Sequence, residues 1–304
     1  MPLPAGISDL LDPNDLARLS GLELLASRVV DGLLSGKHRS QLKGGSAEFT
    51  EHRGYVPGDE IRLIDWKVFG KSDRYVIRQY IEQTSLQVIV VLDGSGSMAF
   101  GLGDQTKFQY ARALAACLTR LVLRQSDSAG LAVLENGACN YVPPRSNPNH
   151  FQALLQRLIQ GRPGGETSLA QHLTELARRI KRRGLIVLLS DCFDDLDALR
   201  QAFQFLRARG HEIILLHTMA PEELSFDFGG WSRFDCLEVD GVHLNLDPAL
   251  VREDYLENVR IFLRDLKKIC GETGCDYQAL PTSQPMGEAL AYYLQRRGAR
   301  LKQT

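Results

Sequence analysis

The sequence predicts an α/β protein with a Rossmann-like, doubly wound and mainly parallel sheet. Three apolar runs of strand length alternate with stretches in which apolar residues recur at helical spacing. These runs cover residues 86–93, 184–191 and 211–218. A strand that is apolar along its whole length is buried on both faces, so helices are expected to cover both sides of the sheet.

The first half of this pattern begins at Leu86. The run LQVIVVLD is expected to form a central strand, and QTKFQYARALAACLTRLVLRQ after it an amphipathic helix. AGLAVLE and NYVPP are expected to form neighbouring antiparallel strands. Asn136-Gly137 lies between them, and this dipeptide suits a type I′ hairpin turn.

The second half continues the alternation of helices and buried strands. A glycine- and proline-containing break separates a helix expected at 150–160 from one expected at 168–183, and Gly210 is expected to end the helix that begins at residue 195. The predicted elements are a helix at 150–160, a helix at 168–183, a strand at 184–191, a helix at 195–210, a strand at 211–218 and helices at 248–274 and 285–297.

Residues 1–85 differ from the remainder because they contain few long apolar runs. We expect them to form an N-terminal mixed α/β extension, a helical and β lobe, ahead of a main domain at 86–304. The segment RYVIRQYIEQ could provide an edge hairpin arm. Two arrangements stay open, a small β-rich lobe or an extension of the main sheet.

Composition excludes several function classes. Lys and Arg number 36 against 37 Asp and Glu, giving a formal net charge of -1. Nucleic acid is therefore not an expected partner, because generic polyanion binding needs a large positive excess.

No apolar run approaches the roughly 20 residues of a membrane-spanning helix. The N-terminus does not resemble a signal peptide, and the 6 cysteines are scattered, so a cytoplasmic protein with reduced thiols is expected.

Polar residues gather where the buried strands end. The first strand is followed by Asp93–Ser97, the second by Ser190–Asp195, and the loop Gly164–Ser168 opens a helix. Ligands of open α/β sheets bind beyond the carboxyl ends of the strands. These three loops are therefore the candidate functional site.

The residue types in these loops suit a hard divalent cation. Asp93, Ser95 and Ser97 alternate along the chain, so their side chains can converge on one point, with Thr167 and Asp191 added from the other loops. Oxygen ligands of this kind suit Mg²⁺. The alternative interpretation of Asp-x-Ser-x-Ser taken alone is a helix N-cap without metal.

The segments VVLDGSGSM, GGETSL and LLSD, in this order, resemble the metal-ion-dependent adhesion site (MIDAS) of von Willebrand factor A-like (vWA) domains. The resemblance implies a vWA-like fold for residues 86–304. It also implies that Ser95, Ser97 and Thr167 are hydroxyl ligands of Mg²⁺ or Mn²⁺. Asp93 and Asp191 match the carboxylates that usually act through water.

A second resemblance covers about residues 20–298. The chain is similar to the bacterial domain-of-unknown-function-58 family, both in its ending TSQPMGEALAYYLQRR and in a string ahead of residue 86. That string comprises Glu48-Phe49, Arg53, Tyr55, Pro57-Gly58-Asp59, Arg62, Ile64-Asp65-Trp66 and Arg78.

Charges of both signs surround an aromatic residue in this string. Arg53, Asp59, Arg62, Asp65 and Arg78 are consistent with a structural ion-pair network around Trp66. The alternative is a partner-binding surface made by Arg53, Asp59, Arg62, Asp65 and Trp66.

Enzyme chemistry is the less favoured interpretation. The segment LLSGKH lacks the first glycine and the Ser/Thr of a phosphate-binding loop. A Mg²⁺-dependent, haloacid-dehalogenase-like phosphatase is the alternative function, since it also places an Asp after the first buried strand. Its second Asp, the general acid, is Ser95 here, and a hydroxyl of ordinary pKa transfers protons poorly near neutrality.

The resemblances instead imply a non-enzymatic, metal-dependent protein-binding module. Its metal would accept an Asp or Glu from a protein partner. The family resemblance further implies a MoxR-type AAA+ ATPase as partner, with an adaptor role in chaperone-like assembly.

Overall fold

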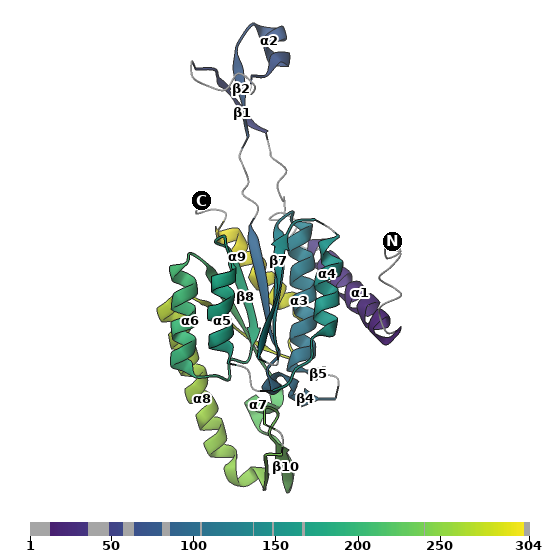
Figure 1. Cartoon of the computed structure of the whole chain (residues 1–304), viewed down its shortest axis with the longest axis vertical. Coiled ribbons are helices and arrows are strands. Elements are labelled where there is room, and N and C mark those ends of the chain that lie inside the picture. Colours follow the sequence, from purple (N-terminus) through teal and green to yellow (C-terminus); the bar gives the residue numbers. More distant parts are fainter. Residues whose placement is uncertain are drawn as a thin grey trace.

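A central sheet of six strands forms the body of the protein (Figure 1). The computed structural model describes residues 13–35, 49–56, 64–80, 86–103, 105–135, 137–147, 149–165, 168–239 and 241–300. The strands lie in the order β12-β9-β8-β3-β6-β7, and only the β6–β7 pair is antiparallel. The predicted doubly wound, mainly parallel sheet is confirmed. The strands are β3 (Gln87–Asp93), β6 (Ser128–Glu135), β7 (Ala138–Arg145), β8 (Leu185–Ser190), β9 (Glu212–Met219) and β12 (Asp276–Pro281).

Helices cover both faces of this sheet, as the apolar strands require. Side chains alternate along β3, so Val88, Val90 and Leu92 pack into one core layer, whereas Ile89 and Val91 pack into the other. The first layer is covered by α1 (Pro13–Ser35), α3 (Lys107–Arg124), α4 (His150–Gln160) and α9 (Met286–Arg300). The second is covered by α5 (Leu169–Arg179), α6 (Leu196–Ala208) and α8 (Pro248–Thr273).

Strand β12 is an element that the apolar pattern did not predict. It pairs in parallel with β9 at the edge of the sheet. Most of its side chains are only half-buried, and Leu280 is the buried exception among them. An edge strand has a neighbour on one side only, so it does not need the continuous apolar run that marks a central strand.

Helix α1 packs on the helices of the main sheet. Ala26 and Val30 are fully buried in the same core layer as α3 and α4. The proposed division at residue 85 stays a prediction.

Residues 49–80 include a small α/β unit. Strands β1 (Phe49–Gly54) and β2 (Val76–Tyr80) pair antiparallel, and α2 (Trp66–Ser72) lies between them in the chain. The ring of Phe69 stacks on that of Tyr75 with 4.5 Å between centroids. In the described residues β1 and β2 form a two-stranded sheet of their own, separate from the six-stranded one.

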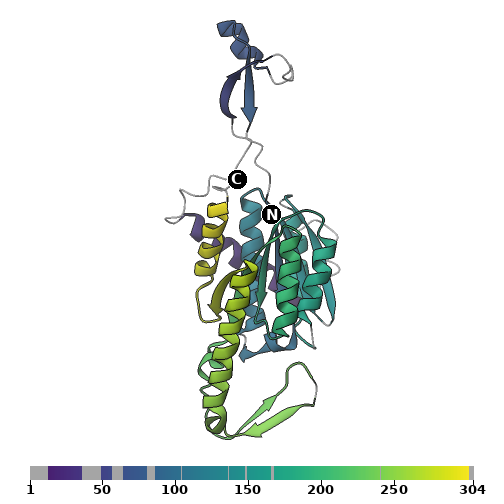
Figure 2. The same ribbon diagram turned by 90° about the vertical axis from the view of Figure 1, so that its left-hand side faces the viewer.

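A projecting hairpin follows β9. The short helix α7 (Pro221–Ser225) leads into β10 (Ser232–Asp235) and β11 (His243–Leu246), which pair antiparallel before α8 begins. Figure 2 shows α8 extending past the sheet and carrying this hairpin at its far end. The ring of Phe226 stacks on Tyr255 of α8 at 4.1 Å and on Phe234 of β10 at 5.8 Å, which fastens the hairpin to the helix.

Three short elements lie between β3 and α3: the 3₁₀ turn η4 (Gly96–Ala99), β4 (Gly101–Leu102) and β5 (Gln105–Thr106).

Candidate functional site

The candidate site lies where the direction of strand order reverses. The chain runs outward from β3 to β6 and β7, and then returns to the other side of β3 to form β8. Asp93 is the last residue of β3, and Asp191 directly follows β8, the parallel neighbour of β3. Crevices at such switch points are the usual ligand sites of doubly wound sheets. The fold thus brings the two predicted carboxylates to one edge of the sheet.

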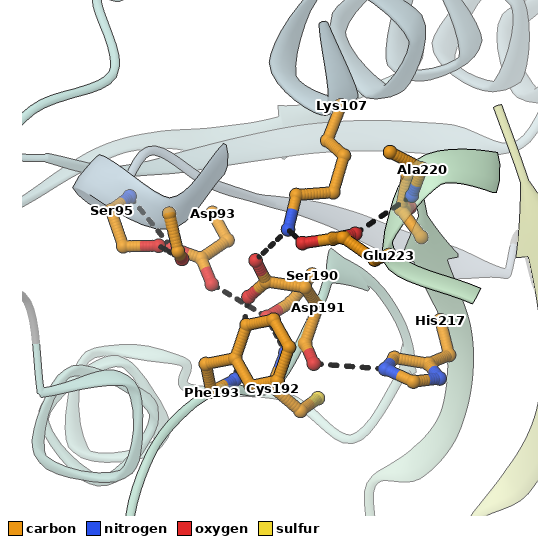
Figure 3. Close-up of polar contacts among 12 residues, drawn as sticks. Asp93, Ser95, Lys107, Ser190, Asp191, Cys192, Phe193, His217, Ala220 and Glu223 are labelled. Carbon is orange, nitrogen blue, oxygen red and sulfur yellow. Dashed lines mark hydrogen bonds and ion pairs between the residues drawn. The ribbon is translucent and has the colours of Figure 1, made fainter. Parts of the chain in front are cut away.

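Asp93 is buried and accepts two hydrogen bonds. The Ser190 hydroxyl donates to Oδ2 at 2.5 Å, and the Ser95 backbone amide donates to Oδ1 at 2.9 Å (Figure 3). Burial, followed by repulsion from the Asp191 carboxylate, raises the pKa of Asp93 to about 6. The structure therefore holds this carboxylate where its negative charge is unfavourable, and a cation nearby would relieve that cost.

The two predicted serines converge. Ser95 Oγ and Ser97 Oγ lie 3.0 Å apart, close enough for a hydrogen bond between them. The loop that carries them is tied to the loop before α5, since Gly164 N donates to Gly94 O and Gly96 N donates to Gly165 O, both at 3.0 Å. Thr167 itself lies outside the described residues.

Asp191 makes an ion pair with a buried lysine. Lys107 Nζ lies 2.6 Å from Asp191 Oδ2 and 2.5 Å from Glu223 Oε1, and the side chain of Lys107 has no exposed surface. The ammonium also lies over two rings, 5.0 Å from the centroid of Phe193 and 5.8 Å from that of Phe100. Glu223 is held in turn by the Ala220 backbone amide, which donates to Oε2 at 2.8 Å.

A histidine fixes the backbone behind Asp191. His217 Nε2 lies 2.8 Å from the Asp191 carbonyl oxygen, and Nδ1 lies 2.9 Å from the Tyr277 hydroxyl. A carbonyl can only accept, so Nε2 carries the proton and Nδ1 accepts from the tyrosine. Burial lowers the pKa of His217 to about 4, which keeps the ring neutral. Cys192 follows with φ 55, a left-handed conformation that makes the sharp turn after Asp191.

The charges of the site fit a divalent cation. The Lys107 ammonium pairs with Asp191 and Glu223, whereas the buried carboxylate of Asp93 lies near that of Asp191 and has no basic partner among its hydrogen bonds to the described residues. Asp93 and Asp191, with the Ser95 and Ser97 hydroxyls, are hard oxygen donors. In the described part of the chain, no three His, Cys, Asp or Glu side chains gather into a metal-binding group. A site that relies on hydroxyl oxygens would not form such a group.

The second set of predicted residues belongs to the small unit of residues 49–80. Asp65 is buried as the N-cap of α2, where its Oδ1 accepts from the backbone amides of Lys67 and Val68. Trp66 is 57% exposed. Arg53 lies on β1, its backbone opposite Ile77, while Asp59 and Arg62 lie outside the described residues. Whether these five form a partner surface stays a prediction.

Lys107, Glu223 and His217 are the polar residues of the site that sequence reasoning missed. Lys107 carried one usable signal, because it is the first residue of a helix, where the helix dipole disfavours a cation. Glu223 sits in a five-residue helix without such a signal, and His217 is embedded in an apolar strand run.

Fold and site together define an α/β protein with buried carboxylates and two neighbouring serine hydroxyls at the switch point of its sheet. The chain belongs to the family described as "Protein of unknown function DUF58", whose model matches residues 51–261. It is 29% identical over 280 residues to the uncharacterized protein Rv1480 of Mycobacterium tuberculosis, covering 91% of this chain and 87% of that protein. The uncharacterized protein Mb1516 of Mycobacterium bovis matches with the same identity and coverage.

Solved structures with a similar arrangement show low sequence identity. BatB from Bacteroides thetaiotaomicron is 16% identical, with a TM-score of 0.46 over 71% of this chain and 100% of that one. The SpRpn10 VWA domain is 10% identical, with a TM-score of 0.39 over 68% of this chain and 94% of that one. With scores this low, the fold assignment depends on the strand order and helical layers described above.

Among the helices that the structure describes, none is both long and apolar enough to cross a membrane.

Proposed function

We propose that this chain is a non-enzymatic protein-binding module that depends on a divalent metal. The observation that carries the proposal is the convergence of the Ser95 and Ser97 hydroxyls, 3.0 Å apart, beside two buried carboxylates that repel one another. Such a site gains stability from a cation, and its neutral hydroxyl donors leave much of the cation's charge uncompensated.

Mg²⁺ or Mn²⁺ is the cofactor of this proposal. Asp93, Ser95, Ser97, Thr167 and Asp191 would hold it, with Lys107 compensating part of the charge on Asp191. Bound there, the ion supplies an electrophilic centre that accepts an Asp or Glu side chain from a protein partner.

The buried position of Asp93 favours this function over phosphatase chemistry. Asp93 is 2% exposed, and each of its oxygens accepts a hydrogen bond from within the chain. A nucleophile must reach the phosphorus atom directly, whereas a carboxylate that acts on a metal through water need not, and a phosphatase also needs a general acid where Ser95 stands. Incubation with p-nitrophenyl phosphate and Mg²⁺ is expected to release no phosphate above a protein-free blank.

The partner of this proposal is a MoxR-type AAA+ ATPase, which the chain would serve as an adaptor in chaperone-like assembly. This choice rests on what the resemblance to the domain-of-unknown-function-58 family implies, and the chain belongs to that family. The test is a pull-down with the ATPase encoded nearest to this protein. We expect retention in Mg²⁺ and release by EDTA.

Asp93→Ala is the matched variant for that pull-down, and it should fail in both buffers while keeping a cooperative unfolding transition. Asp195→Asn is its control, because Asp195 follows the same strand as Asp191 but only caps α6. Equal retention of wild-type protein with and without EDTA would contradict the proposal.

A further inference from the structure

The end of the β10–β11 hairpin lies directly against the loop that carries the two serines. Gly96 stands between Ser95 and Ser97, and a Cβ atom placed on it would lie 2.1 Å from the Leu237 carbonyl oxygen. The same Cβ would lie 2.9 Å from the Glu238 Cα. Both distances are shorter than real Cβ atoms show, so only glycine allows the hairpin to approach this closely.

Glu238 also lines a hollow beside the start of helix α5. This cavity of about 470 Å³ is bounded by Ser168 and the first turns of α5, by Phe193 and Asp194 after β8, and by Glu238. Ser168 directly follows Thr167 in the chain, and Phe193 and Asp194 follow Asp191. Glu238 therefore lies next to the serine loop and also borders the cavity that residues following Thr167 and Asp191 line.

The start of the hairpin segment is tied to the same site. Glu223 of α7 shares the Lys107 ammonium with Asp191, at 2.5 Å and 2.6 Å. Phe226, directly after α7, stacks on Tyr255 and Phe234 and so holds the hairpin on α8. The hairpin is fastened to the site at its root and touches the site again near its tip.

We propose that Glu238 is the acidic ligand that the metal site holds in the absence of a partner. This inference rests on the function proposed above, and it specifies how that site selects its partner. A carboxylate tethered beside the metal has an effective concentration in the millimolar range or higher. Free acidic side chains therefore compete poorly, and a partner must displace Glu238 together with the tip of the hairpin.

The surface near the tip offers the contacts that such a displacement needs. Val239, Val242 and Leu244 are 48%, 53% and 64% exposed. A partner that presents apolar side chains next to its Asp or Glu can engage them while the carboxylate replaces Glu238. The partner is thus a protein surface with an acidic residue in an apolar setting.

The test counts the water ligands of bound Mn²⁺ in the full chain by water-proton relaxation, with affinity measured by Mn²⁺ electron paramagnetic resonance. In Glu238→Gln, Mn²⁺ affinity should fall about tenfold, since affinity depends on the number of charged ligands. Relaxation per bound ion should rise, because water takes the released position. N-acetylglutamate should lower this relaxation in Glu238→Gln and have little effect on wild-type protein.

Two further variants make the result specific. Gly96→Ala leaves every proposed ligand in place but forces the tip away from the loop, so it should raise relaxation as Glu238→Gln does. Asp235→Asn removes a carboxylate of the same hairpin that pairs with Arg233, and it should match wild-type protein.

Unchanged affinity and relaxation in Glu238→Gln, with Mn²⁺ binding still abolished by Asp93→Ala, would overturn the role of Glu238 and leave the proposed function standing. Wild-type protein that binds neither Mn²⁺ nor Mg²⁺ would overturn both.

Discussion

The ammonium group of Lys107 lies 2.6 Å from the carboxylate of Asp191, and these side chains are 0% and 1% exposed. The chain therefore places an ammonium group of its own beside a carboxylate that the sequence predicts to serve a metal. This pairing compensates one of the acidic groups at the switch point. It leaves Asp93 as the group whose charge is least well balanced.

Replacing the lysine should destabilise the fold strongly. In Lys107→Met, the buried Asp191 and Glu223 lose their shared counter-ion. Removing one partner of a buried pair costs about 3–5 kcal/mol in the free energy of unfolding. Urea unfolding measures this loss. The double variant Lys107→Met with Glu223→Gln should recover part of it, and equal loss in the single and double variants would show that the ion pairs do not act together.

Neutralising Asp93 should have opposite effects in the absence and presence of metal. Asp93→Asn removes a buried charge whose pKa is raised to about 6, so it should stabilise the metal-free protein by about 1–3 kcal/mol at pH 7.5. Wild-type protein should then gain stability on addition of Mg²⁺, whereas Asp93→Asn should not. Thermal unfolding in EDTA and in Mg²⁺ measures both effects. A lower melting temperature of Asp93→Asn in EDTA would contradict this account.

The stability of the protein should depend on pH through His217. Burial lowers its pKa to about 4, whereas the unfolded chain has a histidine pKa of about 6.5. Between these values only the unfolded chain binds the proton. The free energy of unfolding therefore falls as pH drops from about 6.5 towards 4, by about 1.4 kcal/mol per pH unit.

The measurement compares the free energy of unfolding of the protein with His217 and of the His217→Gln variant, by urea unfolding at pH 7.5 and pH 5. The protein with histidine should lose about 2 kcal/mol more between these pH values. Both proteins carry Asp93→Asn, because Asp93 has the opposite effect on stability. Its pKa is raised to about 6, so its protonation stabilises the fold as pH falls through 6. Equal losses in the two proteins would show that the folded and unfolded chains bind the His217 proton equally well between these pH values.

Loosening the aromatic cluster should free the hairpin without affecting the sheet. Phe226→Ala removes the ring that stacks on Tyr255 and Phe234. Amide hydrogen exchange should become faster in β10 and β11 and stay slow in β3 and β8, because the two regions open separately. Trp231→Ala, at a side chain that is 75% exposed, is the control and should change neither. Faster exchange throughout the protein would show that the cluster stabilises the whole fold.

Much of the main sheet was predictable from local pattern. Strands β3, β8 and β9 are buried on both faces, so their sequences are apolar runs that periodicity detects. Strand β12 was missed because an edge strand keeps half-buried polar positions such as Gln278. The strands β10 and β11 were missed because each is only four residues long and both faces of the hairpin are largely exposed, so neither forms the buried apolar run that marks a central strand.

The sequence by itself determined which polar residues lie at the switch point. Asp93 ends β3, Ser95 and Ser97 lie within four residues after it, and Asp191 directly follows β8. Both strands are recognisable by composition, and parallel strands bring their carboxyl ends to one edge. Only the tertiary structure decided what surrounds them. Lys107 reaches Asp191 across 84 positions and Glu223 across 116, and the hairpin returns to Gly96 from residues 237 and 238. Contacts across such separations depend on how the layers pack, and no local pattern in the sequence records them.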